Sequence, residues 1–412
     1  MKKGSKRVKT SSDKSPPSTT LPEILRGLPN TLAMDIGTGT KDVLYFSAAN
    51  TIENNIKFVV PTPAKLMAER LLLETGPLSI AGYTMGGGFL AQVLREHREK
   101  GQRVVMEQLP AFTVRNNLEE ILASGIEVVD KINDPTHFFD EIELPLYFDL
   151  LKRFRVDVRQ VKTIAISVQD HGYHTNEESS RRNRFKYFLE HLEADRTPRA
   201  LVFTPKTLPK VFGRLYSGAL SVAHYDPFLQ VILVDTSFSA ILGCSFDPRV
   251  AALKGPLLFI NFGNGHTMAT VMHEGRIQAF FEHHTRLLKD KPQAMLDFMT
   301  RLTEGRLTSD EVFDDDGNGC VTFEPQPFSR ISGIVVTGPK RAIMTETGLG
   351  SFIEAAPGGD MMMTGPLGLL HGAALLSEMN ARSGKTSSQG ASASESESGI
   401  TQDQPLREPC PK

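Results

Sequence analysis

Two glycine-rich segments of this 412-residue sequence carry the side chains best suited to binding or catalysis. The first reads DIGTGTKD and places Asp35 at the end of an apolar run, just before a Gly-Thr-Gly-Thr turn. Because Gly37 and Gly39 have no Cβ, their backbone N–H groups can face an anion. The hydroxyls of Thr38 and Thr40 can donate to the same anion, and Asp35 could hold a hydrated cation opposite it. The segment therefore predicts a site for an anion and its metal counter-ion.

The second segment, NFGNGHT, repeats the pattern much later in the chain, with Asn261 at the position of Asp35. Its candidate binding residues are Asn261, Gly263, Asn264, Gly265, His266 and Thr267. One Gly-x-Gly turn after a strand is weak evidence, because tight hairpins need glycine for steric reasons alone. Two matching turns this far apart predict an internal duplication.

A third segment, VQDHG, delivers Asp170 and His171 from an apolar run into a turn. Four roles stay open for these residues: acid–base chemistry, pocket lining, structural hydrogen bonding, and metal binding together with His174, His283 and His284. An H-x-x-H spacing on an irregular turn does not fix two imidazoles as a helix would, so the metal role needs convergence in space.

All three segments need strands that end at a common edge. Apolar runs such as residues 161–168 and 230–234 alternate with helical patterns such as 89–100 and 292–303. A three-strand pattern followed by alternating helices and strands occurs twice, which predicts an α/β fold of two similar lobes. We expect an N-terminal lobe over residues 29–253 and a C-terminal lobe over 254–380.

The two ends of the chain differ from this body in composition. Residues 1–28 are basic and rich in Ser, Thr and Pro, and residues 381–412 are rich in Ser, Gly and Glu, so both are predicted to be disordered tails.

The composition is that of a soluble globular protein, with 40% hydrophobic residues and a net charge of −2. This charge gives no reason to expect a nucleic-acid partner or an anionic membrane surface. With only three cysteines and no apolar run long enough to span a bilayer, a reducing, cytoplasmic location is predicted.

The pair DIGTGTKD and NFGNGHT, with VVTGPKR and the small-residue helix PLGLLHGAALL, resembles the actin, Hsp70 and sugar-kinase superfamily. The resemblance implies two ribonuclease H-like lobes that clamp Mg-ATP between two phosphate hairpins. It implies that Asp35 with residues 37–40 forms the first phosphate loop and Asn261 with residues 263–267 the second, with Mg²⁺ held near Asp35. It also implies that Gly338 lies near the adenosine, and that Asp235, at the end of VILVD, acts as the general base.

More closely, LAMDIGTGTKD, TMGGG, VQDHG, NFGNGHT, FEHHT and EVFDDDGNG together resemble the family labelled pyruvate formate-lyase activating enzyme. Radical enzymes of that name need a C-x-x-x-C-x-x-C cluster, whereas Cys244, Cys320 and Cys410 stand far apart in this sequence. The expected function is therefore a Mg-ATP-dependent phosphotransferase or ATPase with an unknown small-molecule or protein acceptor, in which Asp235, Asp170 and His171 act on the acceptor. A metal-dependent enzyme and a non-catalytic, nucleotide-regulated scaffold are the alternatives.

Overall fold

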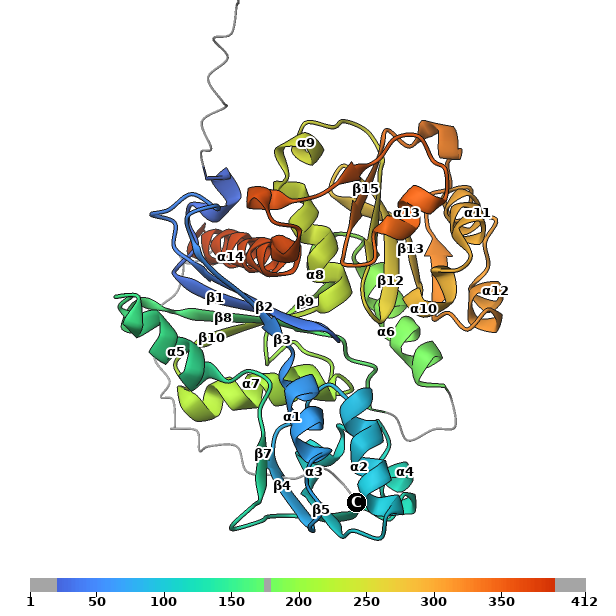
Figure 1. Ribbon diagram of the computed structural model, residues 1–412. Coiled ribbons are helices and arrows are strands. Elements are labelled where there is room, and N and C mark those ends of the chain that lie inside the picture. Colours follow the sequence, from blue (N-terminus) through green and yellow to red (C-terminus); the bar gives the residue numbers. More distant parts are fainter. Residues whose placement is uncertain (1–20, 174–178, 390–412) are drawn as a thin grey trace, which may run out of the picture.

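The computed structural model describes residues 21–173 and 179–389. These residues form two six-stranded sheets and one four-stranded sheet, with helices on their faces (Figure 1). Each glycine-rich segment connects the first two strands of one of the six-stranded sheets.

The first sheet has the order β3-β2-β1-β8-β10-β9. Its strands are β1 Thr31–Ile36, β2 Thr40–Phe46, β3 Ile56–Pro61, β8 Thr163–Val168, β9 Val202–Phe203 and β10 Gln230–Asp235. The first three form an antiparallel meander, and β8 then pairs in parallel with β1, and β10 in parallel with β8. Burial of every residue of β1 and β8 explains why both strands read as continuous apolar runs.

The second sheet repeats this plan in the order β14-β13-β12-β11-β15-β16. Its strands are β11 Leu257–Phe262, β12 His266–His273, β13 Arg276–His284, β14 Gly319–Thr322, β15 Gly333–Thr337 and β16 Ile353–Glu354. β11, β12 and β13 form the meander, and β15 and β16 add in parallel. The first strand of each hairpin begins nine residues before the second, so the two hairpins have the same length of strand and turn. The predicted two-lobed, actin-like ATPase architecture is confirmed by this shared strand order.

A third unit, which the sequence did not reveal, is inserted between β3 and β8 and hangs below the first sheet in Figure 1. Its sheet has the order β6-β5-β4-β7, with β4 Leu78–Gly82, β5 Val104–Glu107, β6 Glu127–Val129 and β7 His137–Phe139. Helices α1 Pro63–Leu71, α2 Phe89–Glu99, α3 Gln108–Ala111 and α4 Leu118–Ala123 belong to the same stretch of chain. It has its own apolar core, and we call it the inserted unit.

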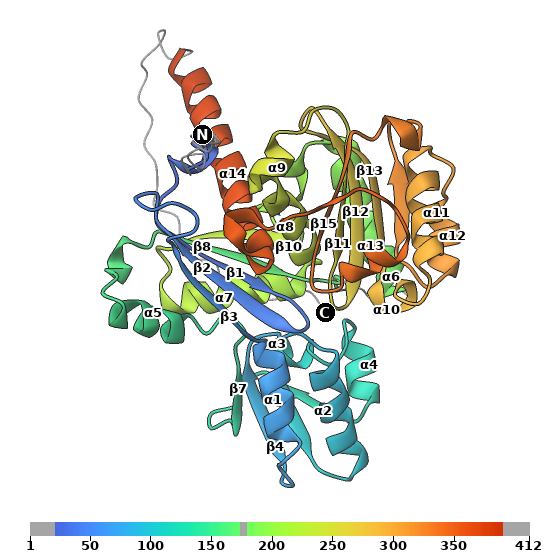
Figure 2. The ribbon, with the colours of Figure 1, turned by 45° about the horizontal axis from the view of Figure 1, so that its top comes forward.

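Two helices, α8 (Thr236–Gly243) and α14 (Thr364–Gln389), lie between the two large sheets (Figures 1 and 2). α14 contacts β1, β8 and β10, while α8 contacts β11 and β12. A Cβ at Gly368 of α14 would lie 1.7 Å from the carbonyl oxygen of Ser239, and one at Gly243 would lie 1.8 Å from that of Thr364. Only glycine permits this backbone approach, so the small residues of both helices set the separation of the lobes.

The remaining helices pack on the two large sheets or on the helices beside them. They are α5 Leu144–Arg153, α6 Ser180–Ala194, α7 Gly213–Tyr225, α9 Pro248–Ala251, α10 Thr285–Leu288, α11 Pro292–Thr303, α12 Ser309–Asp314 and α13 Ala342–Glu346. α7 packs against β8 and β10, and α11 packs against β13 and β14. α6 crosses to the second sheet and contacts β14, so it links the lobes.

The described residues include a part of each predicted tail. Residues 21–28 include a short helix, η1 Glu23–Leu25, in which Leu25 is fully buried against the core. At the other end α14 runs to Gln389, and residues 390–412 lie outside the described part of the chain. Among the helices described, none has the length and apolar character needed to cross a membrane.

Candidate functional site

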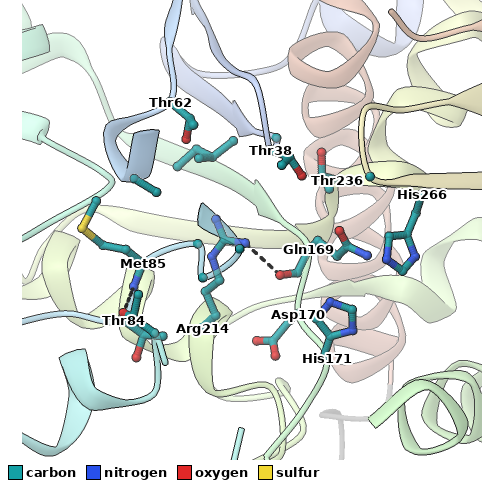
Figure 3. A pocket seen from close by; sticks show the side chains of 18 of the residues that line it. Thr38, Thr62, Thr84, Met85, Gln169, Asp170, His171, Arg214, Thr236 and His266 are labelled. Carbon is teal, nitrogen blue, oxygen red and sulfur yellow. Dashed lines mark hydrogen bonds between the residues drawn. The ribbon is translucent and has the colours of Figure 1, made fainter. Parts of the chain in front are cut away.

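A cavity of 2240 Å³ lies where the two hairpins, the end of β8 and the inserted unit meet (Figure 3). Both glycine hairpins contribute to its wall, together with Gln169 to Tyr173 after β8 and residues 84–91 of the inserted unit. Ligand pockets usually measure about 300–1,000 Å³. The cavity is therefore large enough for two substrates side by side.

The two hairpins meet tip to tip at one end of this cavity. Each is closed in the same way: the N–H of Gly37 donates to the Thr40 carbonyl at 2.9 Å, and that of Gly263 to the His266 carbonyl at 3.0 Å. A Cβ at Gly39 would lie 2.6 Å from the side-chain nitrogen of Asn264. The turns of both lobes therefore face a common space, as the sequence predicted from their glycines.

Asp35 lies at this end and is held by two hydroxyls. Its Oδ1 accepts from Ser167 at 2.6 Å and from Thr236 at 2.5 Å. Burial raises the pKa of Asp35 to about 6, although both hydrogen bonds favour the charged form.

Asp42 faces Asp35 directly across the hairpin, because the register pairs the two residues. Burial, followed by the charge of Asp35, raises the pKa of Asp42 to about 8. Its Oδ1 is buried without a hydrogen-bond partner among the described residues. The equivalent pair in the second hairpin is Asn261 and Met268, so the carboxylates lie only on the first hairpin.

The carboxylate of Asp235, the predicted general base, is engaged by other groups of the protein. Its Oδ1 caps α8 by accepting from the N–H of Ser237 at 3.0 Å, and its Oδ2 lies 2.8 Å from Nη2 of Arg184. Arg184, fully buried on α6, also binds Glu282 of the second sheet, with three donor–acceptor distances of 2.9–3.0 Å. Burial alone would lower the pKa of Arg184, but the charges of Asp235 and Glu282 hold it above its usual value. Asp235 is not among the residues that line the cavity.

Asp170 is also engaged within the fold. Its two carboxylate oxygens accept from the backbone N–H groups of Gly172 and Leu215, both at 2.9 Å. Burial raises its pKa, although these hydrogen bonds oppose the shift. Asp170 therefore shapes the turn that presents His171.

Three imidazoles gather beside the second hairpin. The ring of His266 lies 5.5 Å from that of His171 and 4.3 Å from that of His284, centre to centre, and all three line the cavity. Burial, followed by the charge of His266, holds the pKa of His171 well below its usual value, and burial lowers the pKa of His284 to about 4. At neutral pH, His171 and His284 are therefore uncharged.

The metal alternative finds little support in this arrangement. His283 points to the other face of β13, where its Nε2 lies 3.3 Å from Asp315, since neighbouring residues of a strand alternate. His174 lies outside the described residues. Within residues 21–173 and 179–389, no group of three or more His, Cys, Asp or Glu side chains could hold a metal ion.

Arg214 links the floor of the cavity to the inserted unit. It binds both oxygens of Glu141 at 2.8 Å and the Gln169 carbonyl at 2.9 Å (Figure 3), while Glu141 also accepts from the N–H of Gly86. The turn Thr84–Gly88 is thus fixed over the cavity.

The cavity brings together most of the residues singled out from the sequence. Those that line it are Asp35, Gly37, Thr38, Thr40, Asp170, His171, Asn261, Gly263, Asn264, Gly265, His266 and Gly338. Gly39, Thr267 and Asp235 are not among the lining residues. Thr267 is fully buried and forms a 3.0 Å hydrogen bond with Thr285, below the hairpin.

Sequence reasoning missed Asp42, Gln169 and Thr236, all of which line the cavity. Asp42 could have been found, since it ends the quoted motif DIGTGTKD and a short hairpin must pair it with a residue near Asp35.

These observations define an α/β protein with duplicated ribonuclease H-like lobes and a polar cleft between them. Residues 85–343 match the family described as "Putative pyruvate format-lyase activating enzyme (DUF1786)". The match spans more than half of the chain, so the chain belongs to this family. Comparison with the curated proteins found no match.

Several solved structures are similar in arrangement. One is (R)-2-hydroxyglutaryl-CoA dehydratase component A from Acidaminococcus fermentans, at 10% identity and a TM-score of 0.31, covering 84% of this chain and 97% of that one. Another is an inorganic polyphosphate/ATP-glucomannokinase from Arthrobacter, at 12% identity and a TM-score of 0.33, covering 85% and 100%. A third is a Bacteroides thetaiotaomicron protein with an actin-like ATPase fold, at 10% identity and a TM-score of 0.35, covering 84% and 98%.

Proposed function

We propose that this protein binds Mg-ATP between its two hairpins and transfers the terminal phosphoryl group to an acceptor or to water. The observation that carries the proposal is the meeting of two matched glycine turns at one end of a 2240 Å³ cavity. Such turns present backbone N–H groups to anions. The hydroxyl of Thr38 lines the same cavity and adds a donor for phosphate oxygens.

In this proposal the first hairpin supplies the cation site. Mg²⁺ prefers oxygen ligands and is usually held by one or two carboxylates plus substrate phosphates. Asp35 and Asp42 provide such a pair, and the unpartnered Oδ1 of Asp42 fits a ligand role. When bound, Mg²⁺ would neutralise phosphate charge.

The second hairpin and the end of β8 would act on the phosphate and the acceptor. The turn at residues 263–266 would donate to phosphate oxygens, which are stabilised as charge builds during transfer. Gln169, whose Nε2 is buried without a partner among the described residues, would orient the attacking oxygen. His171, neutral and lining the cavity, would accept its proton, in place of the base expected at Asp235.

The test is calorimetric titration of Mg-ATP and Mg-ADP into the wild type, Asp35→Asn and the exposed control Asp149→Asn. We expect micromolar binding that requires Mg²⁺, is at least about 10-fold weaker in Asp35→Asn, and is unchanged in the control. His171→Gln should retain binding and lose phosphate release from ATP. Absence of heat and of thermal stabilisation with either nucleotide would refute the proposal.

A further inference from the structure

We call the part of the cavity lined by the inserted unit and by residues between 205 and 213, before α7, its outer compartment. Over the whole cavity, the lining residues with positive charge are Lys65, Arg95, Arg115, Arg181, Lys206, Lys210, Arg214 and Arg286, against four acidic ones. Of those acids, Asp35 and Asp42 belong to the hairpin end and Asp170 is satisfied by backbone N–H groups. The cations of the outer compartment are Lys65, Arg95, Arg115, Lys206 and Lys210, and its lining acid is Glu120, so it carries an excess of positive charge in a chain whose net charge is −2.

Some of these cations already have partners within the protein, and the remaining ones are available to a ligand. Arg214 is bound to both oxygens of Glu141, and Arg181 donates to the carbonyls of Gly317 and Phe313. Arg95 differs, because its Nη1 is buried without a partner among the described residues. An unpaired, buried guanidinium nitrogen is costly unless a ligand completes its hydrogen bonds.

Arg95 is aimed at the cavity by its helix. Ala91 and Arg95 are four residues apart on α2, so they share a helix face, and both line the cavity together with Gly88, the residue before the helix. Ala91 is small and leaves space above this face, so a ligand that lies on it reaches the Arg95 guanidinium.

A second guanidinium reinforces this position. Arg115 comes just before α4, which runs beside α2 in Figures 1 and 2, and it lines the cavity as Arg95 does. Burial, followed by the positive charge of Arg115, lowers the pKa of Arg95. Arg115 has one carboxylate partner, Glu120, at 3.5 Å, and both side chains of that pair are about half exposed. Two guanidiniums on neighbouring elements can bind one planar oxyanion together.

The walls beside these arginines are apolar. Phe112 and Tyr173 meet edge to face, with ring centres 5.4 Å apart, and Met85 and Leu118 also line the cavity. A ligand of this compartment therefore needs an anionic end and an apolar body.

We propose that the acceptor substrate is a small organic anion whose carboxylate or phosphate group is bound by Arg95 and Arg115. This inference rests on the proposed function for the word acceptor, but the binding site itself stands on the outer compartment alone. Because the hairpins line the same cavity, an acceptor whose anionic end is held on α2 would turn its reacting group toward the phosphate hairpins.

The test uses phenyl phosphate, phenylacetate and neutral benzyl alcohol as probes, titrated at low ionic strength into nucleotide-free protein. Arg95→Gln and Arg115→Gln are compared with Arg70→Gln, which removes the same charge from α1 in the inserted unit but does not line the cavity. We expect at least one anionic probe to bind the wild type, about 10-fold or more weakly to each cavity variant, and unchanged to Arg70→Gln. Preference between the two anions would identify the recognised group.

Mg-ATP titration into Arg95→Gln separates this inference from the proposed function. Nucleotide binding should persist there, because Arg95 lies on the inserted unit and not on either hairpin. If Mg-ATP does not bind the wild type, the proposed function is refuted but the anion site is not. The anion site is overturned if neither anion binds the wild type, if benzyl alcohol binds equally well, or if both arginine variants bind the anions normally.

Discussion

Replacing Arg184 by Met is expected to lower the free energy of unfolding by about 4 kcal/mol at pH 7. The guanidinium is fully buried, binds Glu282 at 2.9–3.0 Å and lies 2.8 Å from Asp235. Met keeps the apolar stem of the side chain but loses the guanidinium over the Phe188 ring, and it leaves two buried carboxylates without their counter-charge. Removing one partner of a buried ion pair typically costs about 3–5 kcal/mol, which sets the magnitude.

The same helix offers a matched control. Arg182 on α6 lies 2.9 Å from Asp310 on the other lobe, but the two side chains are 45% and 77% exposed. Solvent screens such a pair, so Arg182→Met should cost at most about 1 kcal/mol. Urea unfolding of both variants and the wild type, followed by circular dichroism, compares the two costs.

The cost of Arg184→Met should also depend on pH. Burial alone would raise the pKa of Glu282, yet the charge of Arg184 holds it below its usual value of 4.5. A carboxyl with a depressed folded-state pKa contributes stability above its unfolded pKa, and that contribution is lost as the pH falls through the folded value. Without Arg184, burial raises the pKa instead, so the unpaired carboxyl is destabilising at pH 7 and is relieved by protonation at pH 5. A penalty equal to that of Arg182→Met, or one that stays constant between pH 7 and pH 5, would refute this reasoning.

Three further predictions concern other parts of the fold. Gly368→Ala should lower the unfolding free energy by about 3 kcal/mol or more, because its Cβ would lie 1.7 Å from a backbone oxygen of α8; Gly372→Ala, whose new Cβ meets only side chains at 3.2 Å, should cost less in the same thermal melt. The wild type should lose unfolding free energy as the pH falls from 6.5 to 4, because the folded-state pKa of His284 is about 4 and the unfolded chain binds the proton first. His284→Asn should make this loss smaller by about 2 kcal/mol. Asp42→Asn should reduce the Mg²⁺ dependence of nucleotide binding in calorimetry, and unaltered dependence would exclude Asp42 as a ligand.

The duplicated hairpins could be predicted because their signal is local. A tight turn between two buried strands needs glycine at fixed positions, so the repeat seen in the sequence reappears as equivalent strand pairing in both sheets. The inserted unit was not recognised because two of its strands, β6 and β7, are three residues long and carry no periodic pattern.

The direction in which a side chain points was the harder part of the site. Asp235 does end a strand, as the sequence indicated, but its carboxylate turns to Arg184, which lies much earlier in the chain on α6. The partner of Arg184 in the other lobe, Glu282, is 98 residues further along the chain. No local pattern encodes a contact over such separations, so the buried pair could be found only from the structure.

These contacts suggest which part of the molecule adapts when substrates bind. The two large lobes are held together by backbone contact between α8 and α14 and by the buried Arg184 network, so hinging between them would break interactions that nothing nearby replaces. The inserted unit is joined differently: it has a separate core, and its polar links to α7 include the ion pair of Glu141 with Arg214 and the hydrogen bond from the Thr84 N–H to the Ser217 hydroxyl at 2.8 Å. Closure around an anionic acceptor would therefore move the inserted unit and α2 toward the hairpins, while the phosphate-binding geometry stays fixed between the lobes.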